Sequence, residues 1–508
     1  MNVPPMDMMQ PVQQILMPSA NLTSAYPETL HILSGSFRSL SLFLLAFSPA
    51  RRALSLVQHI SGFGPHQYVG TNREKVRALQ KVRALRKGSK GNAKDEEGLR
   101  AYTTSWAVPP ILSSWEITPE WTVNHLDNFP ITAVSSYITL PPPYTHIYSM
   151  GGPTGEAHSL STQTGSFAEK VQEVLFVPAG DLAEADKTRK ALRYGSHGIE
   201  FASLPGTLDT HLAFVPFLGT NSIEVYTHDP DSGLLTHVYS SPSPRGNATN
   251  DGPRHVKIHP NGKVLYCVTE HNNLLDTYSI SIPDATDDVE RSRERWNTNP
   301  LKYLGTRSLL PPRLSYPSAS ASTVHSFRGD TLMLGPSAGN DLPTEIWATT
   351  RGTTESDRGW VSVFMLDEDG MFVSSSSSDG EQEDGIQRYE TPTSGGKAHA
   401  IDLFPKSSPS VANATTVAVM GSPVWILITD DSDYAAGGAG TGAGAGNYTG
   451  TPVGGVRVLE WDGWSTGGVR EVAGWPPAEG KVTDNTSSPE DDDMEMRGGS
   501  HAVWLTLE

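Results

Sequence analysis

The sequence predicts an all-β fold, namely a seven-bladed β-propeller with low-complexity loop insertions. Short β patterns recur along most of the 508 residues, each with apolar residues in alternation or in a brief apolar run that ends in a polar turn. Units containing several such strands repeat at intervals of roughly 40–50 residues, and about seven can be counted. The 48 Gly and 38 Pro residues suit short strands joined by many turns. A pair of β-sandwiches is the competing architecture.

Predicted strands follow one another along the chain, and no amphipathic helical pattern recurs that would support an α/β sheet. The one helix-like segment, residues 74–90, repeats the letters Lys-Val-Arg-Ala-Leu and is interpreted as a basic surface insertion. The predicted strands fall at residues 30–35, 42–47, 53–57, 64–69, 101–106, 112–117, 131–137, 145–150, 174–177, 197–201, 211–215, 222–226, 255–259, 264–268, 345–350, 360–365, 424–429 and 455–461.

One domain is predicted, closed by strands from the two ends of the chain. Residues 1–28 are expected to be a disordered segment, and residues 29–508 to form the propeller. Several polar, Ser-rich or Gly-rich stretches contain too little apolar surface to offset the entropy of ordering them. These predicted insertions lie near residues 75–100, 374–388, 435–455 and 479–499.

Composition narrows the range of partners and compartments. The net charge of −18 disfavours nucleic acid or an anionic membrane as a partner. The single cysteine, Cys267, excludes an intramolecular disulfide framework and a Cys-rich zinc site. The apolar run 42–47 is too short to span a bilayer, and no segment reads as a targeting signal. A cytoplasmic protein without membrane association is therefore expected.

The most informative stretch is residues 251–270. Residues 255–259 alternate polar and apolar side chains, a Pro-Asn-Gly turn follows, and residues 264–268 form an apolar run of strand length. Arg254 precedes the first strand and Glu270 follows the second. If the two strands pair antiparallel, a cation and a carboxylate share one rim of the propeller.

Five short motifs, in order along the chain, carry a family resemblance. They are residues 197–201 (HGIEF), 252–266 (GPRHVKIHPNGKVLY), 349–352 (TTRG), 392–396 (PTSGG) and 428–431 (ITDD). Together they resemble the lactonase seven-bladed β-propeller family. Within it the resemblance points to the fungal 3-carboxy-cis,cis-muconate lactonizing enzymes, also called carboxy-cis,cis-muconate cyclases. It runs from about residue 30 to residue 504 and is weakest from about residue 75 to residue 170.

The resemblance implies a cofactor-free, metal-free cycloisomerase of aromatic catabolism, in the protocatechuate branch of the β-ketoadipate pathway. Its substrate would be a small anionic polycarboxylate. The family's catalytic cluster, carried over by motif, falls on His197, Arg254, Glu270 and Arg351. A carboxylate of the substrate itself would attack a conjugated double bond, so catalysis depends on holding carboxylates and on delivering a proton to carbon.

Arginine side chains suit the binding of carboxylates and of the negative charge that grows in the reaction, a role expected of Arg254 and Arg351. The general acid is either His197 or Glu270. His197 is slightly favoured because Arg254 can hold Glu270 ionised, whereas burial beside a polyanion would reverse these roles. Each residue also has a structural interpretation, such as an ion pair at a blade junction or a turn residue.

Departures from the family pattern affect the expected substrate more than the fold. After residues 392–396 the fungal type shows a His and then an Asn, where this chain has Lys397 and His399. His501 also replaces a family Asn. Lys397 and His399 are nevertheless predicted to bind substrate. His66 is included in this group because it occupies a position like that of Arg254 in an earlier blade.

Functions of other classes compete with the cycloisomerase. A hydrolase like 6-phosphogluconolactonase would open a sugar lactone with the same rim. A calcium-dependent lactonase would need converging acidic residues. Asp430, Asp431 and Asp433 are the one dense acidic candidate for such a site, and they are better interpreted as a turn. A non-catalytic propeller scaffold is the third alternative, since fold alone does not fix function. A Ser-His-Asp hydrolase is disfavoured because no Gly-x-Ser-x-Gly elbow is found.

Overall fold

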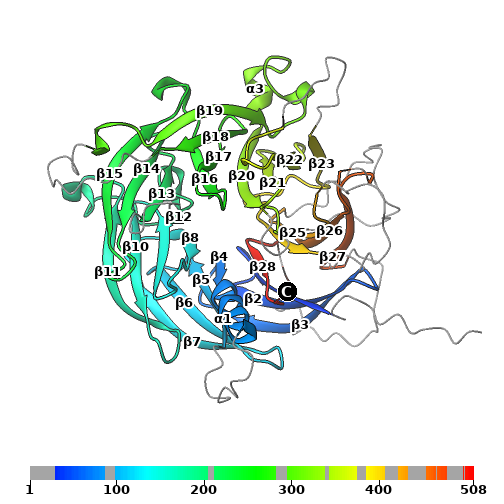
Figure 1. The fold of residues 1–508 in the computed structure, drawn as a ribbon. Coiled ribbons are helices and arrows are strands. Elements are labelled where there is room, and N and C mark those ends of the chain that lie inside the picture. The colour runs from blue at the N-terminus through cyan, green and yellow to red at the C-terminus, as the bar shows by residue number, and fades with distance from the viewer. Residues whose placement is uncertain are drawn as a thin grey trace, which may run out of the picture.

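The computed structural model describes residues 29–507 apart from 86–97, 204–210, 282–294, 338–341, 374–384, 407–420, 433–453, 465, 478–495 and 497. The described residues form seven four-stranded antiparallel sheets arranged around one axis (Figure 1). In Figure 1, β4, β8, β16 and β20 lie near the axis, and β7, β11, β15 and β19 lie at the perimeter. The predicted seven-bladed β-propeller is therefore confirmed.

Each sheet is one blade, and its strands are given from the axis outward. Blades 1 to 3 consist of β28 (Ala502–Trp504), β1 (Leu30–Gly35), β2 (Ser41–Ser48) and β3 (Ala53–Ser61); β4 (His66–Thr71), β5 (Leu99–Ser105), β6 (Ile111–Ile117) and β7 (Val123–Pro130); and β8 (Ser135–Thr139), β9 (His146–Gly151), β10 (Thr154–Leu160) and β11 (Phe167–Leu175).

Blades 4 and 5 consist of β12 (Glu200–Ser203), β13 (His211–Phe217), β14 (Ser222–His228) and β15 (Leu235–Pro242); and β16 (Pro253–Ile258), β17 (Val264–Thr269), β18 (Leu274–Ile280) and β19 (Leu301–Ser308). Blades 6 and 7 consist of β20 (Phe327–Leu334), β21 (Glu345–Gly352), β22 (Trp360–Met365) and β23 (Ile386–Glu390); and β24 (Ile401–Pro405), β25 (Val424–Asp430), β26 (Gly455–Trp461) and β27 (Arg470–Trp475).

The ring is closed by strands from opposite ends of the chain. The inner strand of blade 1, β28, pairs antiparallel with β1, with Ile32 opposite Trp504 and Ser34 opposite Ala502. Figure 1 shows the red C-terminal strand beside the blue N-terminal ones. Trp504 is fully buried and packs near Phe47 and Phe404, so apolar packing between blades 1 and 7 reinforces the closure.

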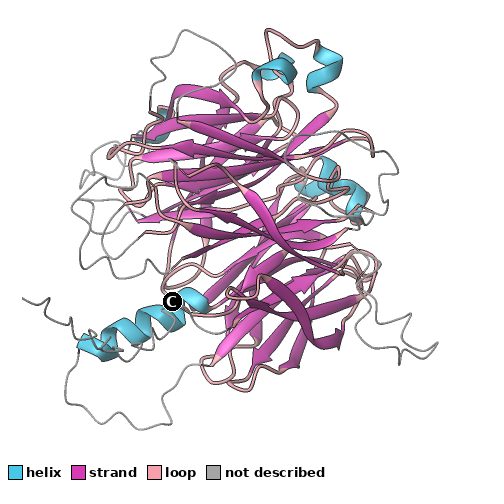
Figure 2. Ribbon diagram, turned by 90° about the vertical axis from the view of Figure 1, so that its right-hand side faces the viewer, coloured by secondary structure: helices cyan, strands magenta, loops and turns pink. Residues whose placement is uncertain are grey.

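In the described part of the chain, helices are few and lie outside the sheets (Figure 2). The longest, α1 (Arg73–Leu85), follows β4 and coincides with most of the predicted basic insertion. The other helices that the structure describes are one short turn, α3 (Ala321–Val324), and the 3₁₀ turns η2 (Ala179–Asp181), η3 (Arg189–Arg193), η4 (Asn247–Thr249), η5 (Arg295–Asn297) and η6 (Pro312–Leu314). Among the described residues, none of the helices has the length and apolar character needed to cross a membrane.

Residues 1–28 and most of the three later predicted insertions fall outside the described residues. The antiparallel order of each blade nevertheless fixes where its loops lie. Inner strands begin, and second strands end, at the same end of the ring, which we call the mouth end. In blade 5 the pairing of Pro253 with Thr269 therefore puts Arg254 and Glu270 together at the mouth end.

Candidate active site

Two arginines and two carboxylates of blades 5 and 6 form a buried cluster at the mouth end, which we call the ion quartet. Arg254 Nη1 lies 2.5 Å from Glu270 Oε2, and Arg254 Nη2 lies 2.6 Å from Asp330 Oδ1. Arg351 Nη2 lies 3.3 Å from the other oxygen of Glu270, and Arg351 Nε lies 3.9 Å from Asp330 Oδ2. Arg254 is only 7% exposed. Both guanidinium groups are thus shared between the same two carboxylates.

The pKa values of Glu270, Asp330 and Arg254 are all shifted toward their charged forms. Burial alone would raise the pKa of Glu270, but the charges of Arg254 and Arg351 outweigh burial and lower it well below its ordinary value. Asp330 shows the same balance, and its pKa is also lowered. Burial works against the charge of Arg254, yet the two carboxylates raise its pKa. Two positive and two negative charges therefore compensate one another.

A close approach of two blades brings Asp330 to Arg254. The N–H of Gly329 in β20 donates to the Glu270 carbonyl oxygen at 3.0 Å. A Cβ atom at Gly329 would lie 2.3 Å from the Thr269 carbonyl oxygen, a distance that real Cβ atoms do not adopt. Only glycine allows the start of β20 to lie this close to the end of β17.

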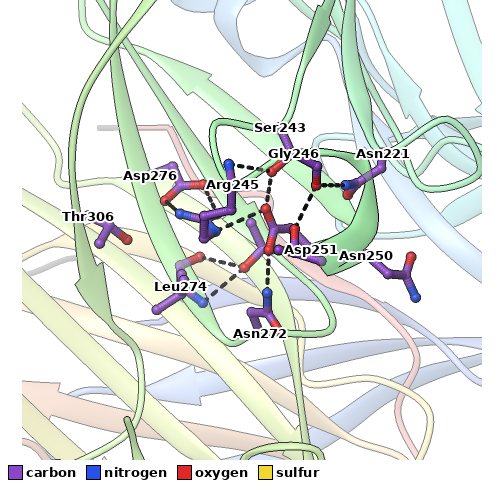
Figure 3. Close-up of polar contacts among 12 residues, drawn as sticks. Asn221, Ser243, Arg245, Gly246, Asn250, Asp251, Asn272, Leu274, Asp276 and Thr306 are labelled. Atoms are coloured by element: carbon purple, nitrogen blue, oxygen red, sulfur yellow. Dashed lines mark hydrogen bonds and ion pairs between the residues drawn. The ribbon is translucent and has the colours of Figure 1, made fainter. Parts of the chain in front are cut away.

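A second buried ion cluster supports the loop that precedes Arg254 (Figure 3). Arg245 Nε lies 2.9 Å from Asp251 Oδ2, and its two terminal nitrogens bind both oxygens of Asp276. Asn272 also donates to Asp251, whose backbone carbonyl accepts the N–H of His271 at 3.0 Å. The fork of Arg245 thus fixes the loop before β16 to β18, and Asp251 of that loop binds the turn that begins with Glu270.

His197 precedes the inner strand of blade 4 and is 6% exposed. Its Nε2 lies 2.9 Å from the carbonyl oxygen of Leu192 in η3. Because a carbonyl only accepts, Nε2 carries the hydrogen and Nδ1 carries the lone pair. Burial, and then the charge of Arg254, lower the pKa of His197 to about 3. His197 is therefore neutral near pH 7 and lies within the electrostatic influence of the quartet.

A cavity of about 620 Å³ opens beside the quartet at the mouth end. Its wall includes Glu270 and Arg351, whereas Arg254, Asp330 and His197 are not among its lining residues. The lining residues come from mouth-end loops and strand ends of blades 4 to 7, and are Arg193, Tyr194, Leu218, Gly219, Asn250, Glu270, His271, Arg328, Arg351, Gly352, Thr353 and Gly396. This volume suits a small-molecule ligand.

Three other residues predicted to bind substrate lie outside this wall. Lys397 follows Gly396, is half-exposed, and places Nζ 3.6 Å from Asp431 Oδ2. The His399 ring bonds the Thr350 carbonyl oxygen at 2.9 Å, and only its backbone N–H reaches the quartet, at 2.6 Å from Asp330 Oδ2. His66 is fully buried against Trp115 and accepts the N–H of Phe63 at Nε2. Neither His399 nor His66 is among the residues that line the cavity.

Sequence reasoning missed Asp330, Arg328, Arg193 and Tyr194. A positional signal could have found Arg328, because it is the second residue of β20, just as Arg254 is the second residue of β16. No sequence signal marks Asp330, because its role depends on its ion pair with Arg254 across the contact between blades 5 and 6.

A further polar group lies along the inner strands of blades 2 to 5 and at the start of the inner strand of blade 1. Lys257 pairs with Glu200, and Glu200 Oε1 accepts the hydroxyl of Tyr137 at 2.9 Å. His501 stacks on Tyr68 with ring centroids 3.7 Å apart and accepts the Val69 N–H at Nδ1. The departure from the family pattern at His501 is therefore accommodated by a specific contact.

The described acidic residues that could have been metal ligands, Asp430 and Asp431, instead pair with cations or hydroxyl groups. Asp430 accepts from Thr393 and lies 3.6 Å from Arg457 Nε, and Asp431 pairs with Arg38. No group of three or more His, Cys, Asp or Glu side chains among the described residues is arranged to hold a metal ion. The last member of the acidic segment, Asp433, lies outside the described residues.

Known proteins that are similar to this chain in sequence include lactonase-family propellers. Residues 203–299 match the model of the "Lactonase, 7-bladed beta-propeller" family. The chain is 26% identical over 391 residues to "Muconate cycloisomerase 1" of Cutaneotrichosporon cutaneum, an alignment that covers 76% of this chain and 86% of that protein. It is 29% identical over 203 residues to a 6-phosphogluconolactonase of Serratia proteamaculans, covering 38% of this chain and 54% of that protein.

Solved structures add information on the fold alone. A periplasmic gluconolactonase of Pseudomonas aeruginosa superposes with a TM-score of 0.54 at 14% identity, covering 94% of this chain and 100% of that one. A putative 6-phosphogluconolactonase of Bacteroides fragilis gives a TM-score of 0.52 at 12% identity, with 95% and 99% covered. The predicted resemblance is therefore confirmed: part of this chain matches the lactonase propeller family in sequence, and its fold is a seven-bladed β-propeller.

Proposed function

We propose that this protein is an enzyme of lactone chemistry that closes a muconate-type polycarboxylate, such as 3-carboxy-cis,cis-muconate, to a lactone. The observation that carries the proposal is the charge-compensated ion quartet with the neutral His197 nearby, beside a cavity of about 620 Å³. The alignment with a muconate cycloisomerase over 76% of the chain supports the same reaction class. A small anionic polycarboxylate is the proposed partner.

The proposed reaction forms one carbon–oxygen bond inside the substrate. A carboxylate oxygen attacks a carbon of the conjugated diene, and the displaced π electrons move onto a remote carboxylate. A proton then adds to the neighbouring carbon, so the trianion becomes a lactone dianion. Attack within one molecule gains from positioning, and Arg351 in the cavity wall favours the developing negative charge.

His197 is favoured over Glu270 as the proton donor. Two arginines hold Glu270 ionised in the free protein. His197 is neutral, and its Nε2–H is committed to Leu192, so proton uptake and delivery would use Nδ1. A bound polyanion raises the pKa of a neighbouring histidine, which increases the protonated fraction when substrate is present.

Purified protein incubated with 3-carboxy-cis,cis-muconate, with and without EDTA, tests this proposal. We expect loss of the diene absorbance with uptake of one proton per turnover in weak buffer, unchanged by EDTA. Replacing His197 with Asn should lower kcat about 10²- to 10⁴-fold without preventing folding, as checked by circular dichroism. A well-folded wild-type protein that leaves the diene intact would reject this substrate.

Hydrolysis of a sugar lactone, as by 6-phosphogluconolactonase, is the second candidate. An ionised Glu270 and a neutral His197 are both bases in the free protein, which suits the activation of water for attack on a lactone carbonyl. The two reactions differ in the direction of proton flow. Opening 6-phosphogluconolactone would release one proton per turnover above the spontaneous rate, whereas ring closure of the diene consumes one.

A further inference from the structure

The cavity wall contains an arginine that the ion quartet does not neutralise. Arg328 is half-buried, and its Nη1 donates to the carbonyl oxygens of His325 and Phe327 at 2.9 and 3.0 Å. Among the described residues no carboxylate lies within ion-pair distance of its guanidinium group. Burial, together with the charge of Arg351, lowers the pKa of Arg328 by more than the charge of Glu270 raises it.

The position of Arg328 in its sheet is unfavourable unless an anion is present. Arg328 of β20 lies directly opposite Arg351 of β21 in the strand register. Like charges facing each other across two strands are destabilising. Arg351 is compensated by Glu270 and Asp330, so Arg328 supplies the uncompensated charge of this pair.

Arg193 adds a second uncompensated cation to the wall. It ends η3, is exposed, and forms no ion pair with a carboxylate in the described part of the chain. Three arginines but only one carboxylate, Glu270, therefore line the cavity, and that carboxylate is already shared by Arg254 and Arg351. The wall offers two guanidinium groups to a ligand.

We propose that Arg328, together with Arg193, forms an anion subsite that holds a carboxylate or phosphate group of the substrate away from the reacting atoms. The subsite rests on the proposed function, which places the substrate in this cavity. The subsite gives the arginines of the site two different roles. Arg254, whose two terminal nitrogens are both held by carboxylates, fixes Glu270 and Asp330, whereas Arg328 and Arg193 bind the distal anion of the ligand.

Calorimetric titration with two unreactive probes, propane-1,2,3-tricarboxylate and 6-phosphogluconate, tests the subsite without requiring turnover. We expect Arg328→Gln to weaken binding of the preferred probe about 10- to 100-fold, as loss of a charge-assisted contact implies. Arg193→Gln should weaken it less because this side chain is more exposed. Binding by the wild-type protein should fall as salt is added.

Arg51→Gln is the matched control, since it removes one positive charge from an exposed turn between β2 and β3, at the end of the ring opposite the mouth. It should leave binding within about twofold of wild type, as an exposed charge beyond the Debye length does. If Arg328→Gln folds poorly, Arg193→Gln and the salt dependence of wild-type binding still test the subsite. Arg193 is an exposed surface side chain, so its replacement should not disturb folding.

Three results would overturn the subsite: wild type that binds neither probe, both variants binding as wild type does, or Arg51→Gln weakening binding as much as Arg328→Gln. Probe binding that depends on Arg328, in a protein that does not cyclise the diene, would keep the subsite and reject the proposed reaction. The preferred probe then tells whether the distal group is a carboxylate or a phosphate. With an active substrate, Arg328→Gln should raise KM while kcat stays within about threefold.

Discussion

At the scale of single residues, each charged group of the site pairs with more than one partner of opposite charge. Arg254 touches both Glu270 and Asp330, and each carboxylate also faces Arg351. Removing one member therefore leaves a buried charge without its counterpart, which is more destabilising than the absence of the whole group. Substrate binding and catalysis both require that this arrangement survive.

Replacing Glu270 with Gln should destabilise the protein by about 3–5 kcal/mol, because Arg254 and Arg351 would then share one carboxylate. The double variant Arg254→Gln, Glu270→Gln should lose less than the sum of the two single variants, with a coupling of about 1–3 kcal/mol. Urea unfolding of the four proteins measures this coupling. Strict additivity would contradict a shared network.

At the scale of elements, the sheets of blades 5 and 6 bring the charged residues together. The end of β17 and the start of β20 touch through backbone atoms, because Gly329 has no side chain. The four charges of the quartet are thus spread over three strands, β16, β20 and β21, and the residue that follows β17. A small displacement between the two blades would separate them.

Gly329→Ala should separate the blades and reduce kcat for whichever lactone reaction the enzyme performs. We expect a loss of stability of about 1–3 kcal/mol from the clash with the Thr269 carbonyl. Gly305→Ala is the control, since a Cβ there meets no atom within 4 Å. Thermal unfolding and initial rates of both variants distinguish the clash from a general effect of replacing glycine, which would affect the two equally.

Sequence patterns predicted the strands that carry Arg254 and Glu270, since β16 and β17 alternate or bury their side chains regularly. They did not predict β20. Its register shifts between Gly329 and Leu332, which breaks the alternation of polar and apolar residues that marks a strand. The ion quartet was consequently predicted without Asp330. The rings of His399 and His66 contact Thr350 in β21 and Trp115 in β6, which are distant in sequence, so these contacts could not be deduced from local sequence.

At the scale of the whole molecule, several histidines are buried in the neutral form. Burial lowers the pKa of His66 to about 4, and that of His197 and His501 to about 3. Each folded-state pKa is below the unfolded value of 6.5, so the unfolded chain binds protons that the folded chain does not. Stability is complete above about pH 6.5 and decreases as pH falls below it.

The free energy of unfolding should therefore decrease by about 1.4 kcal/mol per pH unit for each such histidine between pH 6 and pH 4. Glu270 and Asp330, whose pKa values are lowered, add to the loss only below about pH 4.5. Melting temperatures recorded between pH 7.5 and pH 4.5 test this order. His501→Asn should make the upper part of the curve less steep, whereas a flat curve down to pH 5 would disagree with neutral burial.

The order of strands in blade 1 has a consequence for biosynthesis. Of the described strands, its inner strand β28 is synthesised last, whereas the other three strands of the blade, β1 to β3, are synthesised first. While the chain emerges from the ribosome, six complete blades can form with the hydrogen-bonding edge of β1 still open. An open strand edge recruits other chains. Substitutions in residues 502–504 should therefore lower the yield of monomer from the cell more than they lower the activity of molecules that have closed.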